Sequence, residues 1–109
     1  MTKFDEYINA VIDGSKSLAQ SNFNDLINEA EQDTKAFIDT IKGDLIKWSG
    51  MLVDKKLSEQ DFRDLVEAQK ELLKIQALTR AGLTLTRCER FRSGLISLMI
   101  DKAFEIFPA

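Results

Sequence analysis

Apolar positions in the first half of the chain follow an eleven-residue repeat. Steps of four, four and three residues from Phe4 to Leu52 pass through fourteen positions, of which twelve are apolar and none is charged. The repeat corresponds to about 3.67 residues per turn, which an α-helix can follow almost straight or with a slight right-handed supercoil. It predicts one long helix over residues 3–52, on the order of 70 Å in length. The positions are Phe4, Ile8, Ile12, Ser15, Ala19, Phe23, Leu26, Ala30, Thr34, Phe37, Ile41, Leu45, Trp48 and Leu52.

A break between Gly14 and Asn22 is the alternative for this first arm. The stretch GSKSLAQSN offers a glycine as a stop and Ser or Asn as caps for a following helix. A break would be expected to shift the register of the repeat, and the register continues through the stretch unchanged. The pattern therefore favours the unbroken helix.

The middle of the chain carries several independent signals for the start of a new helix. Ser58 stands where an N-cap is expected, and Asp61 follows three residues later as in a capping box. Leu57 and Phe62 occupy the two positions of a hydrophobic staple. These signals predict a turn at about residues 53–57 and a second helical arm over about 58–107.

The second arm repeats the eleven-residue pattern less regularly. Gly82 and the surrounding leucines and threonines make a break near residues 80–86 the alternative to a continuous helix with a kink. Two columns at the eleven-residue spacing are free of charge: Phe62, Leu73, Thr84, Leu95 and Ile106, and Val66, Ala77, Cys88 and Met99.

The two arms predict an all-α domain over residues 1–109, an antiparallel hairpin of two long helices. Many large apolar residues of the second arm lie outside its columns, and a two-helix hairpin cannot bury them all. We therefore expect two hairpins to pack as a dimeric four-helix bundle, a coiled-coil-like homodimer. The alternative is a compact monomeric four-helix bundle with breaks near 14–22 and 80–86. The expected interaction surface consists of Leu72, Ile75, Leu78, Ile96, Ile100, Phe104 and Phe107.

The charges are divided unevenly between the two arms. The net charge of −3 argues against a general polyanion binder, because neutralising phosphates needs an excess of Lys and Arg on one face. A basic cluster in the second arm, opposed by Glu89 alone, is expected to face acids of residues 18–30 and Glu31 in the hairpin. Its members are Arg80, Arg87, Arg90 and Arg92, and the expected partners are Asp25, Glu29 and Glu31.

No set of residues for chemistry converges. The chain has no His, which removes the usual catalytic triads and most zinc sites. The turn superficially resembles a calcium loop, but only Asp54, Ser58 and Asp61 could coordinate, and cap and staple account for them. Cys88, although near arginines, stands in a charge-free column and is read as a small core residue. No catalytic residue, metal site or cofactor is expected.

These observations favour a non-enzymatic structural or interaction protein, a self-associating assembly or adaptor module whose partners are a second copy and another protein. Residues 94–107 (GLISLMIDKAFEIF) could instead form an amphipathic helix on a membrane surface, although its polar face has few bases. Weak nucleic-acid binding through the basic cluster and Phe91 is a further, less favoured alternative.

The N-terminus lacks the apolar core of a signal peptide, so we expect a cytoplasmic protein. Small residues at Gly14 and Gly94 are expected to let the two arms approach closely.

Overall fold

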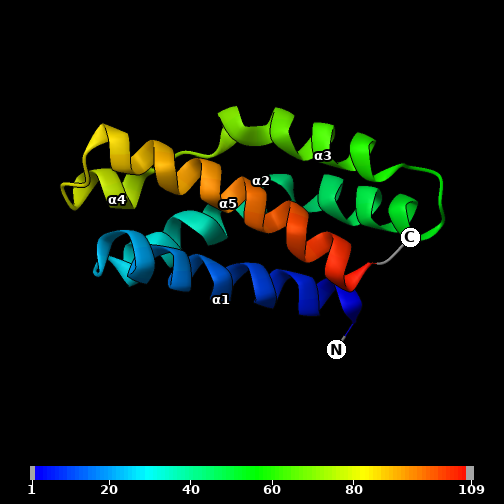
Figure 1. Cartoon of the computed structure of the whole chain (residues 1–109), viewed down its shortest axis with the longest axis horizontal. Coiled ribbons are helices and arrows are strands. Elements are labelled where there is room, and N and C mark those ends of the chain that lie inside the picture. The colour runs from blue at the N-terminus through cyan, green and yellow to red at the C-terminus, as the bar shows by residue number, and fades with distance from the viewer. Residues whose placement is uncertain (1, 108–109) are drawn as a thin grey trace.

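Every regular element of residues 2–107, the part of the chain that the computed structural model describes, is a helix (Figure 1). The all-α class predicted from the sequence is therefore confirmed. The elements are α1 (Lys3–Phe23), α2 (Ile27–Val53), α3 (Glu59–Ala68), the short 3₁₀ helix η1 (Gln69–Leu72), α4 (Gln76–Arg80) and α5 (Leu85–Ile106).

The first arm is two antiparallel helices, so the prediction of one unbroken helix over residues 3–52 is wrong. The chain reverses between Phe23 and Ile27, and the longest dimension of the molecule is 42 Å. Asn24 and Leu26 make the reversal with left-handed backbone angles, φ 56° and 59°. The fold matches the compact four-helix alternative, but the first break lies beyond the expected stretch of 14–22, and Gly14 is inside α1.

The eleven-residue repeat nevertheless marks the inward face of α2 and borders that of α1. None of its fourteen positions is exposed, and the positions in α2 from Ala30 to Leu52 are all buried. In α1 most repeat positions are only half-buried, and the fully buried Tyr7 and Val11 lie outside the repeat.

The turn between α2 and α3 lies where predicted, and of the expected capping box the Ser58 half is formed. α2 ends at Val53, and Ser58 is the N-cap of α3, its hydroxyl accepting a hydrogen bond of 3.0 Å from the Asp61 amide. Lys55 takes a left-handed conformation, φ 61°, within this turn.

The second arm is broken at two places. The predicted continuous helix over 58–107 is therefore wrong, and the alternative break near 80–86 is present, since α4 ends at Arg80, α5 begins at Leu85, and Gly82 has φ 95°. A second break, not expected, covers residues 73–75, where the backbone leaves the 3₁₀ helix in an extended conformation at Leu73. Leu73 and Ile75 are both buried, so this break carries apolar side chains into the core.

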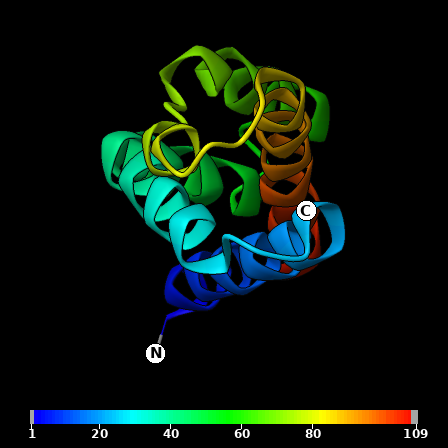
Figure 2. The ribbon, with the colours of Figure 1, turned by 90° about the vertical axis from the view of Figure 1, so that its left-hand side faces the viewer.

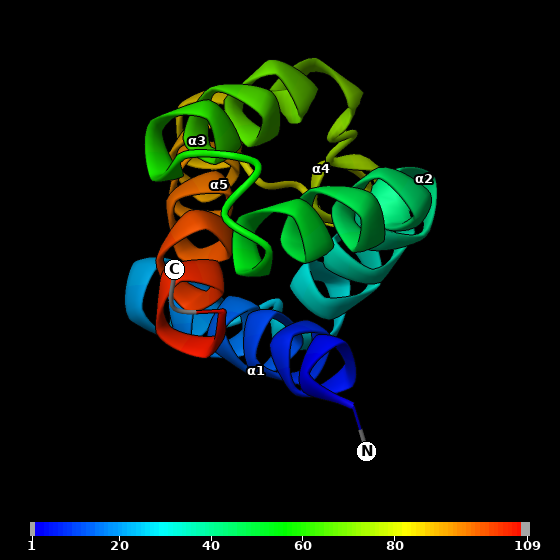
Figure 3. The same cartoon turned by 90° about the vertical axis from the view of Figure 1, so that its right-hand side faces the viewer.

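The helices surround a common interior (Figures 2 and 3). α1 packs against α2 and α5, α3 packs against α2 and α5, and α4 packs against α2 and α5 at one end. The largest fully buried side chains come from four different helices, Tyr7, Phe37, Phe62 and Phe91.

The contact between α1 and α5 is close because each helix presents a glycine to a leucine of the other. A Cβ atom on Gly14 would lie 2.7 Å from Leu98 Cδ2, and one on Gly94 would lie 2.9 Å from Leu18 Cδ2. The sequence correctly predicted that these glycines lie between the arms, although each faces a leucine and not the other glycine. About two helical turns before Gly14, the Tyr7 hydroxyl donates to the Met99 carbonyl at 2.9 Å, and burial raises the pKa of this phenol.

Candidate functional site

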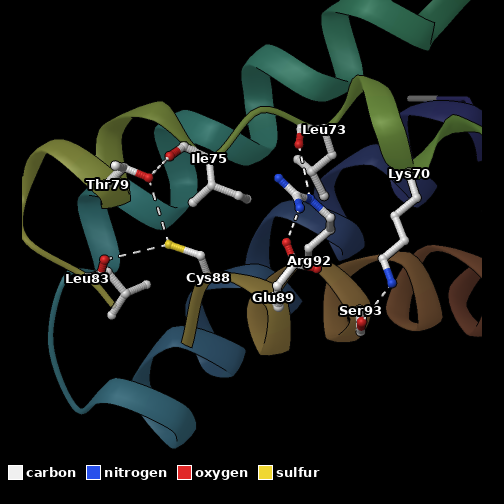
Figure 4. Close-up of polar contacts among 9 residues, drawn as sticks. All are labelled: Lys70, Leu73, Ile75, Thr79, Leu83, Cys88, Glu89, Arg92 and Ser93. Atoms are coloured by element: carbon white, nitrogen blue, oxygen red, sulfur yellow. Dashed lines mark hydrogen bonds and ion pairs between the residues drawn. The ribbon is translucent and has the colours of Figure 1, made fainter. Parts of the chain in front are cut away.

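A concave region lies where η1, α4 and the first turns of α5 meet (Figure 4). Its position depends on a buried carboxylate of α2. Asp33, only 4% exposed, accepts hydrogen bonds from the amides of Ala77 and Leu78 at 2.9 and 3.0 Å. These amides belong to the first turn of α4, whose N-cap Ile75 makes no side-chain cap. The Asp33 carboxylate therefore caps α4 from another helix.

The loop after α4 fixes the start of α5. Gly82 occupies the left-handed region, which favours glycine, and the Thr84 hydroxyl accepts a hydrogen bond of 3.3 Å from the Arg87 amide. Leu85 consequently becomes the first residue of α5, and its side chain is 79% exposed.

The first hollow has a volume of about 730 Å³ and lies between α4 and α5. Cys88 forms part of its floor and is 5% exposed, in agreement with the core position predicted for it. Its Sγ atom lies 3.8 Å from both the Thr79 hydroxyl oxygen and the Leu83 carbonyl oxygen (Figure 4). The hollow is lined by Glu71, Leu73, Lys74, Ile75, Gln76, Thr79, Arg80, Leu83, Leu85, Cys88, Glu89 and Arg92.

Charged side chains at one edge of the first hollow stabilise its walls. Arg92 donates from Nε to the Leu73 carbonyl at 3.2 Å and forms an ion pair with Glu89 (Figure 4). Lys70 donates to the Ser93 hydroxyl at 2.8 Å. The Arg92–Leu73 bond joins the extended segment after η1 to α5, and the Lys70–Ser93 bond joins η1 itself to α5.

A second hollow of about 760 Å³ lies on the other side of Leu85, between α1 and α5. Leu85 and Glu89 line both hollows. We call Leu85 together with the two hollows the Leu85 surface. The second hollow is lined by Leu18, Asn22, Leu85, Thr86, Glu89, Arg90, Ser93 and Gly94.

The interaction surface expected from the sequence is mostly buried within the chain. Five of its seven residues are buried within the same chain, because the breaks at 73–75 and 81–84 let α4 and α5 turn toward the other helices; these are Ile75, Leu78, Ile96, Ile100 and Phe107. Phe104 is half-buried, with its ring 5.9 Å from that of Phe62. Leu72 alone of the seven is exposed, at 46%. The seven residues therefore do not form one exposed surface.

The basic cluster is only partly used in contacts within the chain. Arg80, Arg87 and Arg90 are exposed, and over residues 2–107 none of them forms an ion pair, while Arg92 pairs with Glu89. The expected pairing with Asp25, Glu29 and Glu31 is not formed. Glu31 instead pairs with Lys16 at 2.9 Å, which lowers the pKa of its carboxyl group.

Sequence reasoning named the arginines of this region but missed Leu85. A leucine three residues after a glycine gave no signal of exposure, because its exposure depends on where α5 begins. Within the described residues no group of three or more His, Cys, Asp or Glu side chains could hold a metal ion. No helix in that range has the length and apolar character needed to cross a membrane. Comparison with models of protein families, with curated proteins and with solved structures finds no significant match.

Proposed function

We propose that this protein is a non-enzymatic interaction module that binds an acidic segment of another protein through the Leu85 surface. The observation that carries the proposal is the exposure of Leu85, at 79%, between two hollows of about 730 and 760 Å³. A single exposed leucine is ordinary, but one flanked on both sides by concave surface offers an apolar contact with room for a partner's side chains.

The charge around the Leu85 surface supports an acidic partner. Arg80 lines the first hollow and Arg90 the second, and both lack an ion-pair partner in the described chain. Glu89, which lines both hollows, is already paired with Arg92. Free guanidinium groups bind carboxylates with paired hydrogen bonds and speed the encounter with acidic partners.

The burial of two apolar features favours this proposal over nucleic-acid binding and over membrane binding. Phe91, the aromatic residue of the basic cluster, is fully buried at 0% exposure, so it offers no face on which a base could stack. The apolar side of residues 94–107 packs into the core through Leu95, Met99 and Ala103, so it is not presented to a membrane in this state.

Selection of peptides from a random display library on the immobilised protein tests the proposal. We expect enriched peptides to combine one or two apolar residues with several Asp or Glu residues. Leu85→Glu should weaken their binding at least about tenfold, because it places a charge in the apolar contact and repels acidic peptides.

Ile46→Glu is the matched control. Ile46 is 50% exposed on α2 and lines neither of the two hollows, so this change should leave peptide affinity unchanged. Arg90→Gln should weaken binding and reduce its dependence on salt concentration. The proposal is contradicted if the selected peptides have the same affinity for the Leu85→Glu variant as for the original protein. A selection that enriches no sequence would contradict it as well.

A further inference from the structure

The turn between α1 and α2 is short and has an unusual backbone for its sequence. Three residues, Asn24 to Leu26, join helices of 21 and 27 residues. Asn24 and Leu26 are left-handed, with φ of 56° and 59°. Asparagine tolerates this conformation, but a leucine adopts it at an energetic cost. Leu26 is also the N-cap of α2 and provides no side-chain hydrogen bond there.

The local sequence is compatible with a straight helix through the same residues. The stretch Asn22–Ile27 contains neither Gly nor Pro, and the eleven-residue repeat passes through Phe23, Leu26 and Ala30 without a change of register. The apolar periodicity and the tertiary packing therefore oppose each other at Leu26, where contacts with the rest of the fold hold α1 back against α2 and Asn24 is the residue that locally tolerates the turn.

A second copy of the chain can provide those contacts equally well. They join α1 to α2 and α5: the Tyr7 hydroxyl bonds to the Met99 carbonyl, Gly14 receives Leu98, and Lys16 pairs with Glu31. None of them depends on which chain supplies α1. The hydrogen bonds of the turn run to its own flanking helices, as from the Asn24 amide to the Gln20 carbonyl.

We propose that Asn24–Leu26 is a hinge through which two copies of the chain exchange α1. In the exchanged dimer, residues 3–53 form one helix of about 75 Å, and each α1 occupies its usual place on the other copy. Every contact of α1 is retained, while Asn24 and Leu26 leave the left-handed region. The exchange also completes the second hollow between two chains, because Leu18 and Asn22 then come from the second copy. The exchange does not depend on peptide binding at the Leu85 surface.

Two substitutions at the exposed residue Asn24 test the hinge with little change in packing. Asn24→Ala replaces a residue that tolerates the left-handed conformation with one that favours helix. Because each dimer contains two hinges, this change should raise the dimer-to-monomer ratio on the order of tenfold. Asn24→Gly favours the turn and should lower the ratio. Ser17→Ala, at an exposed position in the middle of α1 in both forms, should leave it unchanged. The ratio is measured by size-exclusion chromatography with light scattering after refolding at high protein concentration.

Cross-linking then shows which chain supplies α1. Unlabelled chain and chain labelled with heavy nitrogen are refolded together, and a carbodiimide joins the Lys16 amine to the Glu31 carboxylate, which lie 2.9 Å apart. Mass spectrometry of the dimer should find cross-links between labelled and unlabelled peptides, whereas the monomer should give cross-links within one chain.

The proposal is overturned by a dimer whose Lys16–Glu31 cross-links all stay within one isotopic form. It is equally overturned if refolded Asn24→Ala, with helix content matching the original by circular dichroism, contains no more dimer than Asn24→Gly. The cross-link on the unmodified sequence keeps the test decisive even if the alanine variant fails to fold.

Discussion

Asp33 shows how a single residue determines the position of a whole element. Its carboxylate is 4% exposed and accepts two backbone hydrogen bonds at the start of α4. A charged acceptor that meets two amide donors makes stronger hydrogen bonds than a neutral one, and the amides would otherwise be buried without partners. The sequence shows Asp33 as one acid among several of α2, because its partners lie more than forty residues away.

Removing this carboxylate should destabilise the protein markedly. Asp33→Ala leaves the Ala77 and Leu78 amides unpaired, and we expect the free energy of unfolding to fall by about 3 kcal/mol. Asp39→Ala, at an exposed position of the same helix, should change it by less than about 0.5 kcal/mol. Urea denaturation measures both values. Equal stability of the two variants would show that Asp33 does not cap α4.

At the scale of elements, the apolar repeat identified the inward face of α2 but neither that of α1 nor the reversal of the chain. The reversal has no glycine or proline to announce it, and its second left-handed residue is a leucine, Leu26. The α2–α3 turn was predictable because Ser58 and Asp61 lie close in sequence and form the cap locally. The breaks at 24–26 and 73–75 have no comparable local signal, since contacts with the rest of the fold impose them, and both were missed.

Two helical glycines should respond in opposite ways to the same substitution. Gly94→Leu forces a side chain toward Leu18 in the α1–α5 contact, and we expect it to lower the free energy of unfolding by about 2 kcal/mol. Gly43→Leu, in an exposed part of α2 with open space around it, should raise that energy by about 0.5–1 kcal/mol through helix propensity. Urea denaturation of the two variants checks the difference. A Gly94→Leu protein as stable as Gly43→Leu would mean that α1 and α5 do not approach so closely.

At the scale of the molecule, the breaks in the second arm decide what is core and what is surface. The surplus of apolar residues suggested a dimer interface, because an unbroken hairpin cannot bury them. Folding into shorter helices buries Leu78, Ile96 and Ile100 within one chain instead. The same breaks create the Leu85 surface, which explains why the site could not be predicted from periodicity, whereas its arginines were visible as a charge cluster.

The central claim is that the chain reverses at Asn24–Leu26, so that α1 returns along α2. Small-angle X-ray scattering on the monomeric fraction, separated by size-exclusion chromatography, tests this claim most directly. We expect a maximum dimension close to the 42 Å long axis of the fold, once hydration is allowed for. A monomer extending to about 70 Å, the length of an unbroken first arm, would contradict it.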